Sequence, residues 1–567
     1  MNIETIRHSL SHVMAAAILE LYPNAKLAIG PAIENGFYYD FDLGSDSFKP
    51  EDLHKIEKKM REIINQKLPF EKSESDAKSA IKQMSNQPYK VELIEDLVKA
   101  GEKSVSFYKM GSFTDLCKGP HVENTEELKN IGFKLDKIAG AYWRGSEKNK
   151  MLQRIYGLAF ETKEELAKYE EFLIEAEKRD HRKLGSQMDL FSFHEEGPGF
   201  PFWHPKGMII WDSLMSWWKG EHKKAGYVEI KTPIILSRDL WEQSGHWDNY
   251  KDAMYFTKID DRDFAIKPMN CPGGMLIYKN SLHSYKEFPI RVAEVGLVHR
   301  HELAGTLHGL MRVRAFHQDD AHVYCLPNQI ESEVNNIIDL IDKMYGRLGL
   351  KYHIELSTKP EKKSIGSDEM WTKAEKALQN VLEKKKIDYK LNAGDGAFYG
   401  PKIDFHITDA IGRTWQTGTI QLDFAMPERF ELEYIDENSK KQRPVMIHRT
   451  VLGSFERFIG VMIEHFAGAL PVWLAPVQAV IIPISEKHIE YAKKIEKELL
   501  EKDIRVEIDD RNESMGKKIR ESELQKVPYM LVVGDKEIEV NKISVRKYGE
   551  GDKGVIEVKD VVESINA

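Results

Sequence analysis

The sequence predicts a multidomain protein that combines α+β and α/β domains, and three observations support this prediction. Its 567 residues allow about four domains at roughly 150 residues each. Helix-like and strand-like patterns alternate over residues 1–160, and short strand patterns mix with long helices over residues 187–470. From residue 475 onward, strand and helix patterns alternate in the way typical of a compact α/β domain with mostly parallel strands.

The N-terminal elements follow from the spacing of apolar residues. A helix is expected over residues 6–21, a strand over 36–41 and a charged helix over 51–66. Residues 163–185 are highly charged, and their few apolar residues recur at helical spacing. This stretch is therefore expected to be a solvated connecting helix.

Two changes in composition mark the later boundaries. The segment GPGFPFWHPKG at residues 197–207 predicts an irregular loop that enters a new domain, and the pattern changes again near Pro471. Beyond Pro471 we expect strands at AVIIPI, RVEID and YMLVVG, with helices over 485–502 and 515–525. The expected segments are a first domain at 1–162, a linker helix at 163–186, a central domain at 187–471 and a C-terminal domain at 472–567.

The composition excludes several classes of protein. A net charge of −9 argues against a basic coat for bulk nucleic-acid binding. No apolar run approaches the ~18 residues of a membrane-spanning helix, and no secretory signal is visible at the start. The 3 cysteines are too few for a disulfide framework. We therefore expect a cytoplasmic protein with no membrane partner.

Two short pairs of potential metal ligands stand out in the first domain. His8 and His12 are four residues apart, so on a helix they project from one face. That face lies roughly opposite the apolar side, so neither is expected to be a core histidine. Cys117 and His121 flank a Gly-Pro turn that could bring thiol and imidazole together. The four groups could bind zinc, act as a general acid–base cluster, or be two unrelated surface pairs.

Two arginines of the central domain are candidates for phosphate binding. Arg300 follows the strand-like run RVAEVGLV, and Arg457 follows the start of a predicted helix. A guanidinium donates two parallel hydrogen bonds to phosphate oxygens, although a structural salt bridge would explain each arginine alone. Cys271, His322 and His448 lie too far apart in the sequence for their spacing alone to indicate a metal site.

Nine segments in order resemble class II aminoacyl-tRNA synthetases and, within them, the threonyl-tRNA synthetase family. They are GPAIENGFYYDFD, CKGPH, GPGFPFWHPKG, KPMNCPGG, LHGLMRVRAFHQDDAH, DGAFYGPKIDF, WQTGTIQLDF, HRTVLGSFERFIG and VPYMLVVGDKE. The resemblance implies an α+β editing domain, a class II catalytic core built on an antiparallel sheet, and an α/β anticodon-binding domain. It also implies L-threonine, ATP with Mg²⁺ and tRNA(Thr) as partners, one Zn²⁺ per subunit, and a homodimer whose motif 1 ends near Pro233.

The resemblance assigns roles to individual residues of the central domain. Arg300 and Arg457 would hold the ATP phosphates, His246 would serve aminoacyl transfer and Lys402 activation. Further ATP-binding positions are Glu302, Arg312, Gln416 and Thr419. The zinc ligands would be Cys271, His322 and His448. The amino-acid pocket would contain Met269, Gln318, Asp320, Tyr399 and Gln421.

The outer domains also contain positions that match family motifs. The editing residues would be His8, His12, Lys90, Asp115, Cys117 and His121, without a required metal. The residues that read the anticodon would be Asn512, Arg520, Glu537 and Arg546. Many family members begin with a small ubiquitin-like domain, and because Met1 lies seven residues before His8 we expect that domain to be absent.

Selectivity explains why such an enzyme needs both a metal and a second site. Threonine and valine are nearly isosteric, and an apolar pocket separates such pairs by only about 10²-fold. A zinc ion with three protein ligands keeps open positions that the amine and hydroxyl of threonine would fill, and Asp320 would accept a hydrogen bond from that hydroxyl. Serine keeps both groups and lacks only a methyl group, worth roughly 1–3 kcal/mol, so a hydrolytic site is expected.

Three alternatives compete with this hypothesis. A prolyl enzyme shares the anticodon-type domain, but the zinc set and the N-terminal motifs argue against it. A non-catalytic paralogue would lack an ATP-clamp arginine, and Arg300 and Arg457 are both present. A purely structural zinc module needs a fourth ligand, and no nearby donor is compelling.

Overall fold

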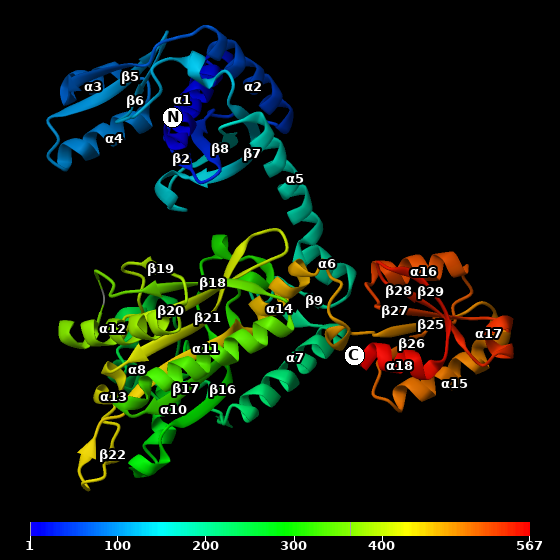
Figure 1. Ribbon diagram of the computed structural model, residues 1–567. Helices are drawn as coiled ribbons and strands as arrows, with labels where there is room; N and C mark the ends of the chain where they lie inside the picture. The colour runs from blue at the N-terminus through cyan, green and yellow to red at the C-terminus, as the bar shows by residue number, and fades with distance from the viewer. Residues whose placement is uncertain (1, 363, 567) are drawn as a thin grey trace. The chain divides into compact units, whose positions relative to one another are not determined.

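A computed structural model describes residues 2–362 and 364–566 of the protein (Figure 1). These residues form two compact units, divided between Ile174 and Glu175. Among the described residues, no helix is both long and apolar enough to cross a lipid bilayer. Each unit is described by itself.

The first unit contains an antiparallel sheet covered by two helices. The sheet has the order β1-β3-β8-β7, and β2 pairs with β3. Helices α1 (Ile3–Leu21) and α2 (Pro50–Asn65) pack on it, with Leu10, Phe41 and Met60 in the shared core. The strands are β1 (Lys26–Leu27), β2 (Ala32–Ile33), β3 (Gly36–Asp42), β7 (Gly132–Tyr142) and β8 (Met151–Phe160).

Helix α1 is buried on almost every side. Its residues from Ser9 to Ile18 are all buried, and His12 is only 3% exposed. The expectation that neither histidine belongs to the core is therefore wrong for His12. The reason is that Phe113 and Val122, from a distant part of the chain, belong to the same core cluster as α1 and cover the face left free by the sheet.

A second, smaller sheet of the first unit supplies the rest of the histidine cluster. Strands β4 (Glu71–Asp76), β5 (Ser104–Met110) and β6 (Phe113–Leu116) pair antiparallel in that order. Helices α3 (Ala77–Gln83) and α4 (Pro88–Lys99) pack on it through Ala80, Ile94 and Phe107. Asp115 lies on β6 and Cys117 directly after it, so this sheet determines where both side chains point.

The predicted connecting helix is divided in two. Helix α5 (Lys163–Arg179) has a single buried residue, Leu166, as expected of a solvated helix. The chain then breaks at Asp180, whose side chain accepts a hydrogen bond from Arg182 N and caps α6 (His181–Gln187). The prediction of a solvated helix is wrong for α6, because His181, Leu184 and Gly185 are buried.

The second unit is organised around an eight-stranded sheet (Figure 1). Its order is β11-β16-β17-β24-β21-β20-β18-β19, and all pairs except the two at its edges are antiparallel, which confirms the predicted core. The strands are β11 (Val228–Glu229), β16 (Ile290–His299), β17 (Ala315–Cys325), β18 (Lys351–Ser357), β19 (Tyr389–Asn392), β20 (Lys402–Thr408), β21 (Thr414–Asp423) and β24 (Val445–Ser454).

Long amphipathic helices bury one face of this sheet. Leu214, Ile341, Leu378 and Phe458 belong to one core cluster with the inward-facing residues of the strands. The helices that supply them are α7 (Pro205–Lys224), α11 (Ile330–Arg347), α12 (Asp368–Lys384) and α14 (Phe455–His465). The polar side chains of the other face remain available for a site.

Short elements complete the surroundings of the sheet. Helix α10 begins at Cys271, and α9 begins at His246, so both start at predicted functional residues. These elements are β9 (Phe191–Ser192), β10 (Phe202–Trp203), β12 (Ile235–Ser237), α8 (Arg238–Gln243), α9 (His246–Tyr250), β13 (Tyr255–Ile259), β14 (Arg262–Ile266), α10 (Cys271–Tyr278), β15 (His283–Ser284), α13 (Ala425–Arg429), β22 (Tyr434–Ile435) and β23 (Lys441–Gln442).

The C-terminal part of the second unit is a five-stranded sheet with helices around it. Its order is β26-β25-β27-β28-β29. The first three strands are parallel as predicted, whereas β28 and β29 add an antiparallel hairpin. The elements are β25 (Ala479–Pro483), α15 (Ile489–Leu500), β26 (Val506–Ile508), α16 (Met515–Leu524), β27 (Tyr529–Val533), α17 (Asp535–Glu539), β28 (Ile543–Lys547), β29 (Gly551–Ile556) and α18 (Val558–Asn566).

Candidate functional site

The predicted ATP-binding residues line one cavity of about 440 Å³ on the polar face of the large sheet. Strands β16 and β17 pair antiparallel, so the segment between them brings Arg300 and Arg312 to the same end. Glu302 forms an ion pair with Arg312, whose Nη2 lies 2.9 Å from Oε2. The lining includes all six predicted positions, namely Arg300, Glu302, Arg312, Gln416, Thr419 and Arg457.

Arg457 enters this cavity from the first turn of α14. Ser454 caps the helix by accepting a hydrogen bond from Arg457 N at 3.1 Å. The Nε atom of Arg457 is buried without a hydrogen-bond partner, and burial followed by the charge of Arg312 lowers the pKa of its guanidinium. Two crowded guanidinium groups without enough carboxylates make this cavity suited to a polyanion.

Lys402 lies beside the cavity, and its amine is already paired. Its Nζ lies 2.9 Å from Asp404 and 3.1 Å from Asp395. Burial is the largest single influence and lowers the pKa of Lys402, but the Asp404 and Asp395 carboxylates together outweigh it, so the net shift is upward. Gln416 Nε2 donates to the other Asp404 oxygen at 2.7 Å, which links Lys402 to the cavity wall.

Cys271, His322 and His448 are brought together by the tertiary structure. His322 on β17 and His448 on β24 are direct partners in the sheet register, and Cys271 comes from the first turn of α10. All three are buried, and one potential ligand atom of each lies within 4.8 Å of the others. Strand pairing therefore explains why widely separated residues meet.

The hydrogen bonds around this triad fit a metal site. His448 Nε2 lies 2.9 Å from Asp423 Oδ2, so the carboxylate orients the imidazole and leaves Nδ1 free as a ligand. His322 Nε2 is buried without a hydrogen-bond partner. Burial, then the charges of His448 and Arg449, lowers the pKa of His322 well below its ordinary value, so it presents the neutral imidazole that binds metals.

The predicted amino-acid pocket adjoins the triad. The Tyr399 hydroxyl donates to Gln421, and the Tyr399 ring centroid lies 4.8 Å from that of His448. Asn270 Nδ2 donates to Asp320 at 3.3 Å. Gln318 is separate from this group and lines the cavity with Arg300.

His246 faces the same region and is held as a neutral imidazole. Its Nδ1 lies 2.8 Å from Ser244 Oγ, and its Nε2 lies 3.0 Å from the sulfur of Met269. Burial, followed by the charges of His448 and Arg300, lowers the pKa of His246 to about 3. At neutral pH its imidazole is therefore unprotonated.

His8, His12, Cys117 and His121 form a second cluster in the first unit. Cys117 Sγ lies 3.3 Å from His8 Nε2 and 3.3 Å from His121 Nε2. Potential ligand atoms of all four residues lie within 4.8 Å of one another. The structure thus excludes the alternative that these are two unrelated surface pairs.

A buried charge network supports this cluster from beneath. Lys90 Nζ forms an ion pair with Asp115 at 2.6 Å, and His12 Nε2 lies 3.8 Å from the same carboxylate. The Tyr39 hydroxyl donates to Asp115 at 2.5 Å. The predicted companions Lys90 and Asp115 are therefore in place, while Tyr39 was not predicted.

The four members of the cluster are neutral at physiological pH. Burial raises the pKa of Cys117 to about 11 and, with the neighbouring histidines, lowers that of His121 to about 2. Ser9 directs its hydroxyl hydrogen to Thr5 O at 2.8 Å, so His121 Nδ1 must donate to Ser9 across 3.1 Å. His121 Nε2 is then an acceptor that faces the thiol.

The four predicted anticodon residues belong to the C-terminal part of the second unit. Asn512 and Arg520 are exposed, and Glu537 and Arg546 are half-buried. Glu537 accepts a hydrogen bond from Gly534 N at 3.0 Å, and Arg546 Nε has no partner. No hydrogen bond or ion pair joins any two of these four described residues.

Sequence reasoning missed the residues that orient the predicted ones. Asp423, Asn270 and Asp404 hold His448, Asp320 and Lys402, and Ser9 holds His121. Asp423 and Asp404 lie inside recognised motifs, but a motif alone does not tell which carboxylate faces which partner. Ser9 is adjacent to His8 in sequence and gives no separate signal.

Three parts of the chain match known protein families. Residues 255–466 match the tRNA synthetase class II core domain (G, H, P, S and T). Residues 478–567 match an anticodon binding domain. Residues 105–156 match the threonyl and alanyl tRNA synthetase second additional domain.

Similar proteins cover almost the whole chain. A threonine–tRNA ligase of Acetivibrio thermocellus is 60% identical over 99% of this chain and 88% of its own length. A threonine–tRNA ligase of Carboxydothermus hydrogenoformans is 59% identical over 100% of this chain and 88% of its own length. The structure of the RNA binding domain of threonyl-tRNA synthetase from Cryptosporidium parvum is 43% identical and has a TM-score of 0.66, covering 68% of this chain and 98% of that one. The chain therefore belongs to the threonine–tRNA ligase family of class II aminoacyl-tRNA synthetases.

Proposed function

We propose that the protein uses ATP to activate L-threonine and transfers the threonyl group to the 3′ end of tRNA(Thr). One observation carries this proposal. Arg300, Arg312 and Arg457 line a cavity on the sheet whose adjacent strands β17 and β24 also hold the buried His322 and His448. A polyanion site and a potential metal site thus share one face, which suits the joining of a nucleotide to a small amino acid.

The residues of the cavity suit adenylate formation. This reaction is an in-line attack of a carboxylate on the α-phosphate, and it depends on positioning and charge neutralisation. We assign Arg300 to the α-phosphate, and its guanidinium is oriented by Pro268 O, which accepts from its Nε at 3.3 Å, and by the Phe316 ring, 5.0 Å away. Arg457, unpaired at Nε, is placed for the remaining phosphates, with Mg²⁺ bound to ATP.

We assign Zn²⁺ to Cys271, His322 and His448, one ion per subunit. When bound, zinc with three protein ligands offers open positions to the amine and hydroxyl of threonine, and valine cannot fill the second. Asp423 fixes the tautomer of His448. Asp320 is held by Asn270 beside the triad, where it can accept a hydrogen bond from the substrate hydroxyl.

Transfer to tRNA requires a group that accepts a proton from the terminal ribose. His246 is neutral and fixed by Ser244, so it can take that role directly or through a water molecule. Lys402, held by Asp404, contributes positive charge at the edge of the same site during activation.

We propose that the first unit hydrolyses seryl-tRNA(Thr) made by mistake. Cys117 lies between His8 and His121, which are both neutral, and His12 lies 3.8 Å from Asp115, which forms an ion pair with Lys90. Neutral imidazoles can take a proton from an attacking water, and none of this chemistry requires a metal.

The remaining expectations belong to the same proposal. Asn512, Arg520, Glu537 and Arg546 are assigned to the anticodon of tRNA(Thr). A homodimer through motif 1 is supported by the exposed apolar residues Val228, Ile234 and Ile235 around Pro233. A cytoplasmic location suits the 3 free cysteines.

Pyrophosphate exchange tests the synthetic activity. The purified protein should exchange pyrophosphate into ATP with threonine, weakly with serine, and not with valine or proline. Exchange that depends on proline alone would refute the proposal. Arg457→Ala should abolish the threonine-dependent signal, because it removes an unpaired cation from the cavity.

Deacylation of seryl-tRNA(Thr) tests the editing activity. We expect His8→Ala combined with His12→Ala to slow deacylation by about 10²–10⁴-fold, the usual contribution of general acid–base catalysis. Threonine charging should be unchanged. His54→Ala, an exposed histidine on α2 of the same unit, is the matched control. Normal clearance of seryl-tRNA by the double variant would reject the assignment.

A further inference from the structure

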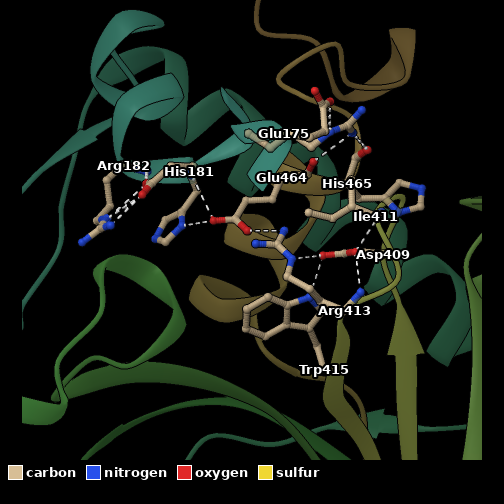
Figure 2. Close-up of polar contacts among 11 residues, drawn as sticks. Glu175, His181, Arg182, Asp409, Ile411, Arg413, Trp415, Glu464 and His465 are labelled. Carbon is tan, nitrogen blue, oxygen red and sulfur yellow. Dashed lines mark hydrogen bonds and ion pairs between the residues drawn. The ribbon is translucent and has the colours of Figure 1, made fainter. Parts of the chain in front are cut away.

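The segment that follows α5 places one buried imidazole against the core of the second unit. His181 begins α6 and is completely buried. Figure 2 shows its ring directed at Glu464, which comes from the last turn of α14. His181 Nδ1 lies 2.6 Å from Glu464 Oε1, and His181 N donates to the same oxygen at 3.1 Å.

The second ring nitrogen of His181 contacts a different element. Leu310 N donates to His181 Nε2 at 2.9 Å. Because Nε2 accepts, it carries no hydrogen, so Nδ1 carries the hydrogen and donates to Glu464. The neutral imidazole thus links the short helix η6 (Gly309–Met311) to the end of α14.

Both linked elements belong to the wall of the ATP cavity. Leu310 and Met311 of η6 line it, and so does Arg457, which lies two turns before Glu464 on α14. Helices of this length behave as rigid rods, rising about 1.5 Å per residue. The position of Glu464 therefore affects where Arg457 points.

Two glycines allow these elements to approach so closely. A Cβ at Gly309 would lie 2.2 Å from His181 Nε2, and Gly309 has a φ of +48°. A Cβ at Gly460 on α14 would lie 3.1 Å from the Leu310 side chain. A larger residue at either position would push His181, η6 and α14 apart, so both glycines are needed for this close contact.

The other Glu464 oxygen is held by the turn between β20 and β21. Arg413 Nη2 forms an ion pair with Glu464 Oε2 at 2.6 Å, and Arg413 Nε donates to Asp409 at 2.7 Å (Figure 2). Arg179 Nη1 also donates to His465 O at 2.9 Å, at the end of α14. Glu464 is therefore immobilised, and His181 adds a hydrogen-bonded link to η6 beside the direct packing of α14 on Leu310.

We propose that His181 is a positioning residue for the ATP site, which holds η6 at a set distance from Arg457. The inference rests on the proposed binding of ATP between Arg300 and Arg457. His181 touches no substrate, and it acts through Leu310 and Glu464. The connecting segment after α5 thus contributes to nucleotide binding.

Two amide substitutions separate the two contacts. His181→Asn keeps a donor near the position of Nδ1 and loses the acceptor for Leu310 N. His181→Gln keeps an acceptor near the position of Nε2 and loses the donor to Glu464. We expect His181→Asn to raise the KM for ATP about tenfold in threonine-dependent pyrophosphate exchange, as when one buried donor loses its acceptor. His181→Gln should raise it less, and the KM for threonine should stay unchanged in both.

Controls distinguish positioning from stability. His465→Asn changes the adjacent histidine, whose Nδ1 has no hydrogen-bond partner, and should leave the KM for ATP unchanged. Gly309→Ala, which displaces η6 from His181, should reproduce the higher KM and replaces His181→Asn if that variant fails to fold. A structural role alone would lower the melting temperature and the amount of active enzyme without moving the KM for ATP.

Failure of the inference about His181 and failure of the proposed activity give different results. A wild-type KM for ATP in His181→Asn or Gly309→Ala overturns the inference, and so does an equal increase in His181→Asn and His181→Gln. Lack of threonine-dependent exchange by the wild-type protein would instead overturn the proposed activity. Retention of exchange by Arg457→Ala would overturn the placement of ATP.

Discussion

His8, His12, Cys117 and His121 in the first unit offer the same donor atoms as Cys271, His322 and His448 in the second. In the first cluster the thiol lies 3.3 Å from each of two imidazoles, and all members except the buried His12 partly face solvent. In the second all three are buried, His322 Nε2 has no partner, and Asp423 orients His448. Each cluster has one imidazole nitrogen that is buried without a hydrogen-bond partner, His12 Nδ1 in the first and His322 Nε2 in the second. The clusters differ instead in the contacts of the thiol and in the carboxylate that orients His448.

This difference separates an acid–base site from a metal site. Donors that bond to one another need no ion, and their neutral forms are stabilised by burial. A buried donor without a partner costs free energy unless a ligand satisfies it. Both clusters contain such an atom, but only in the second does a carboxylate hydrogen-bond to a histidine of the cluster, as is common for histidines that bind metals. Proximity of four donors alone would have favoured the first cluster.

The largest expected effect tests the metal assignment directly. Cys271→Ser should remove zinc and abolish threonine-dependent pyrophosphate exchange, because serine is a poor ligand for zinc. Cys117→Ser is the matched variant in the other cluster, and it should keep both zinc and exchange. Metal analysis of the purified proteins measures this. Zinc that remains in Cys271→Ser, or leaves with Cys117→Ser, would reverse the comparison.

A smaller effect is expected from the carboxylate behind the metal site. Asp423→Asn should weaken zinc binding by about 10–100-fold, because an amide orients His448 less strongly and makes it less basic. Competition with a chelator measures the affinity. Asp115→Asn changes the carboxylate beneath the other cluster and should leave zinc affinity unchanged. Equal affinity in both variants would mean that Asp423 does not support a ligand.

The smallest effect concerns acid stability of the first unit. The pKa of His121 is lowered to about 2 in the folded state, mainly by burial, whereas an unfolded histidine titrates near ~6.5. Below pH ~6.5 the unfolded state binds more protons at His121 than the folded state does. Stability contributed by the neutral imidazole is therefore complete above pH ~6.5 and is lost progressively as the pH falls.

The His121→Gln variant measures this contribution. The wild-type free energy of unfolding around α1 should fall by about 1.4 kcal/mol more than that of the variant between pH 7.5 and pH 5.5. Hydrogen exchange of peptides from α1 reports it. His54→Gln, at an exposed position on α2, should behave like the wild type. The same acid dependence with and without His121 would show that the cluster is not held neutral.

Hydrophobic spacing predicted most elements but not how they are covered. The helix expected over residues 6–21 is present as Ile3–Leu21, and the C-terminal strands and helices lie where the pattern indicated. Burial of His12 was missed, because Phe113 and Val122 approach α1 from far along the chain. The charged pattern of residues 163–185 described α5 correctly and concealed α6, whose His181 is buried by long-range contacts.

The sequence by itself determined the elements, the family and the residue types of each site, because local spacing and ordered motifs are properties of the chain. Only the tertiary structure decided which donors are free. It paired His322 with His448 across β17 and β24 and brought Asp423 within hydrogen-bonding distance of His448. It also placed His181 between Leu310 and Glu464. The physical reason is that strand register and helix packing set distances between side chains from 25 to 283 residues apart in the sequence, and hydrogen bonding depends steeply on those distances.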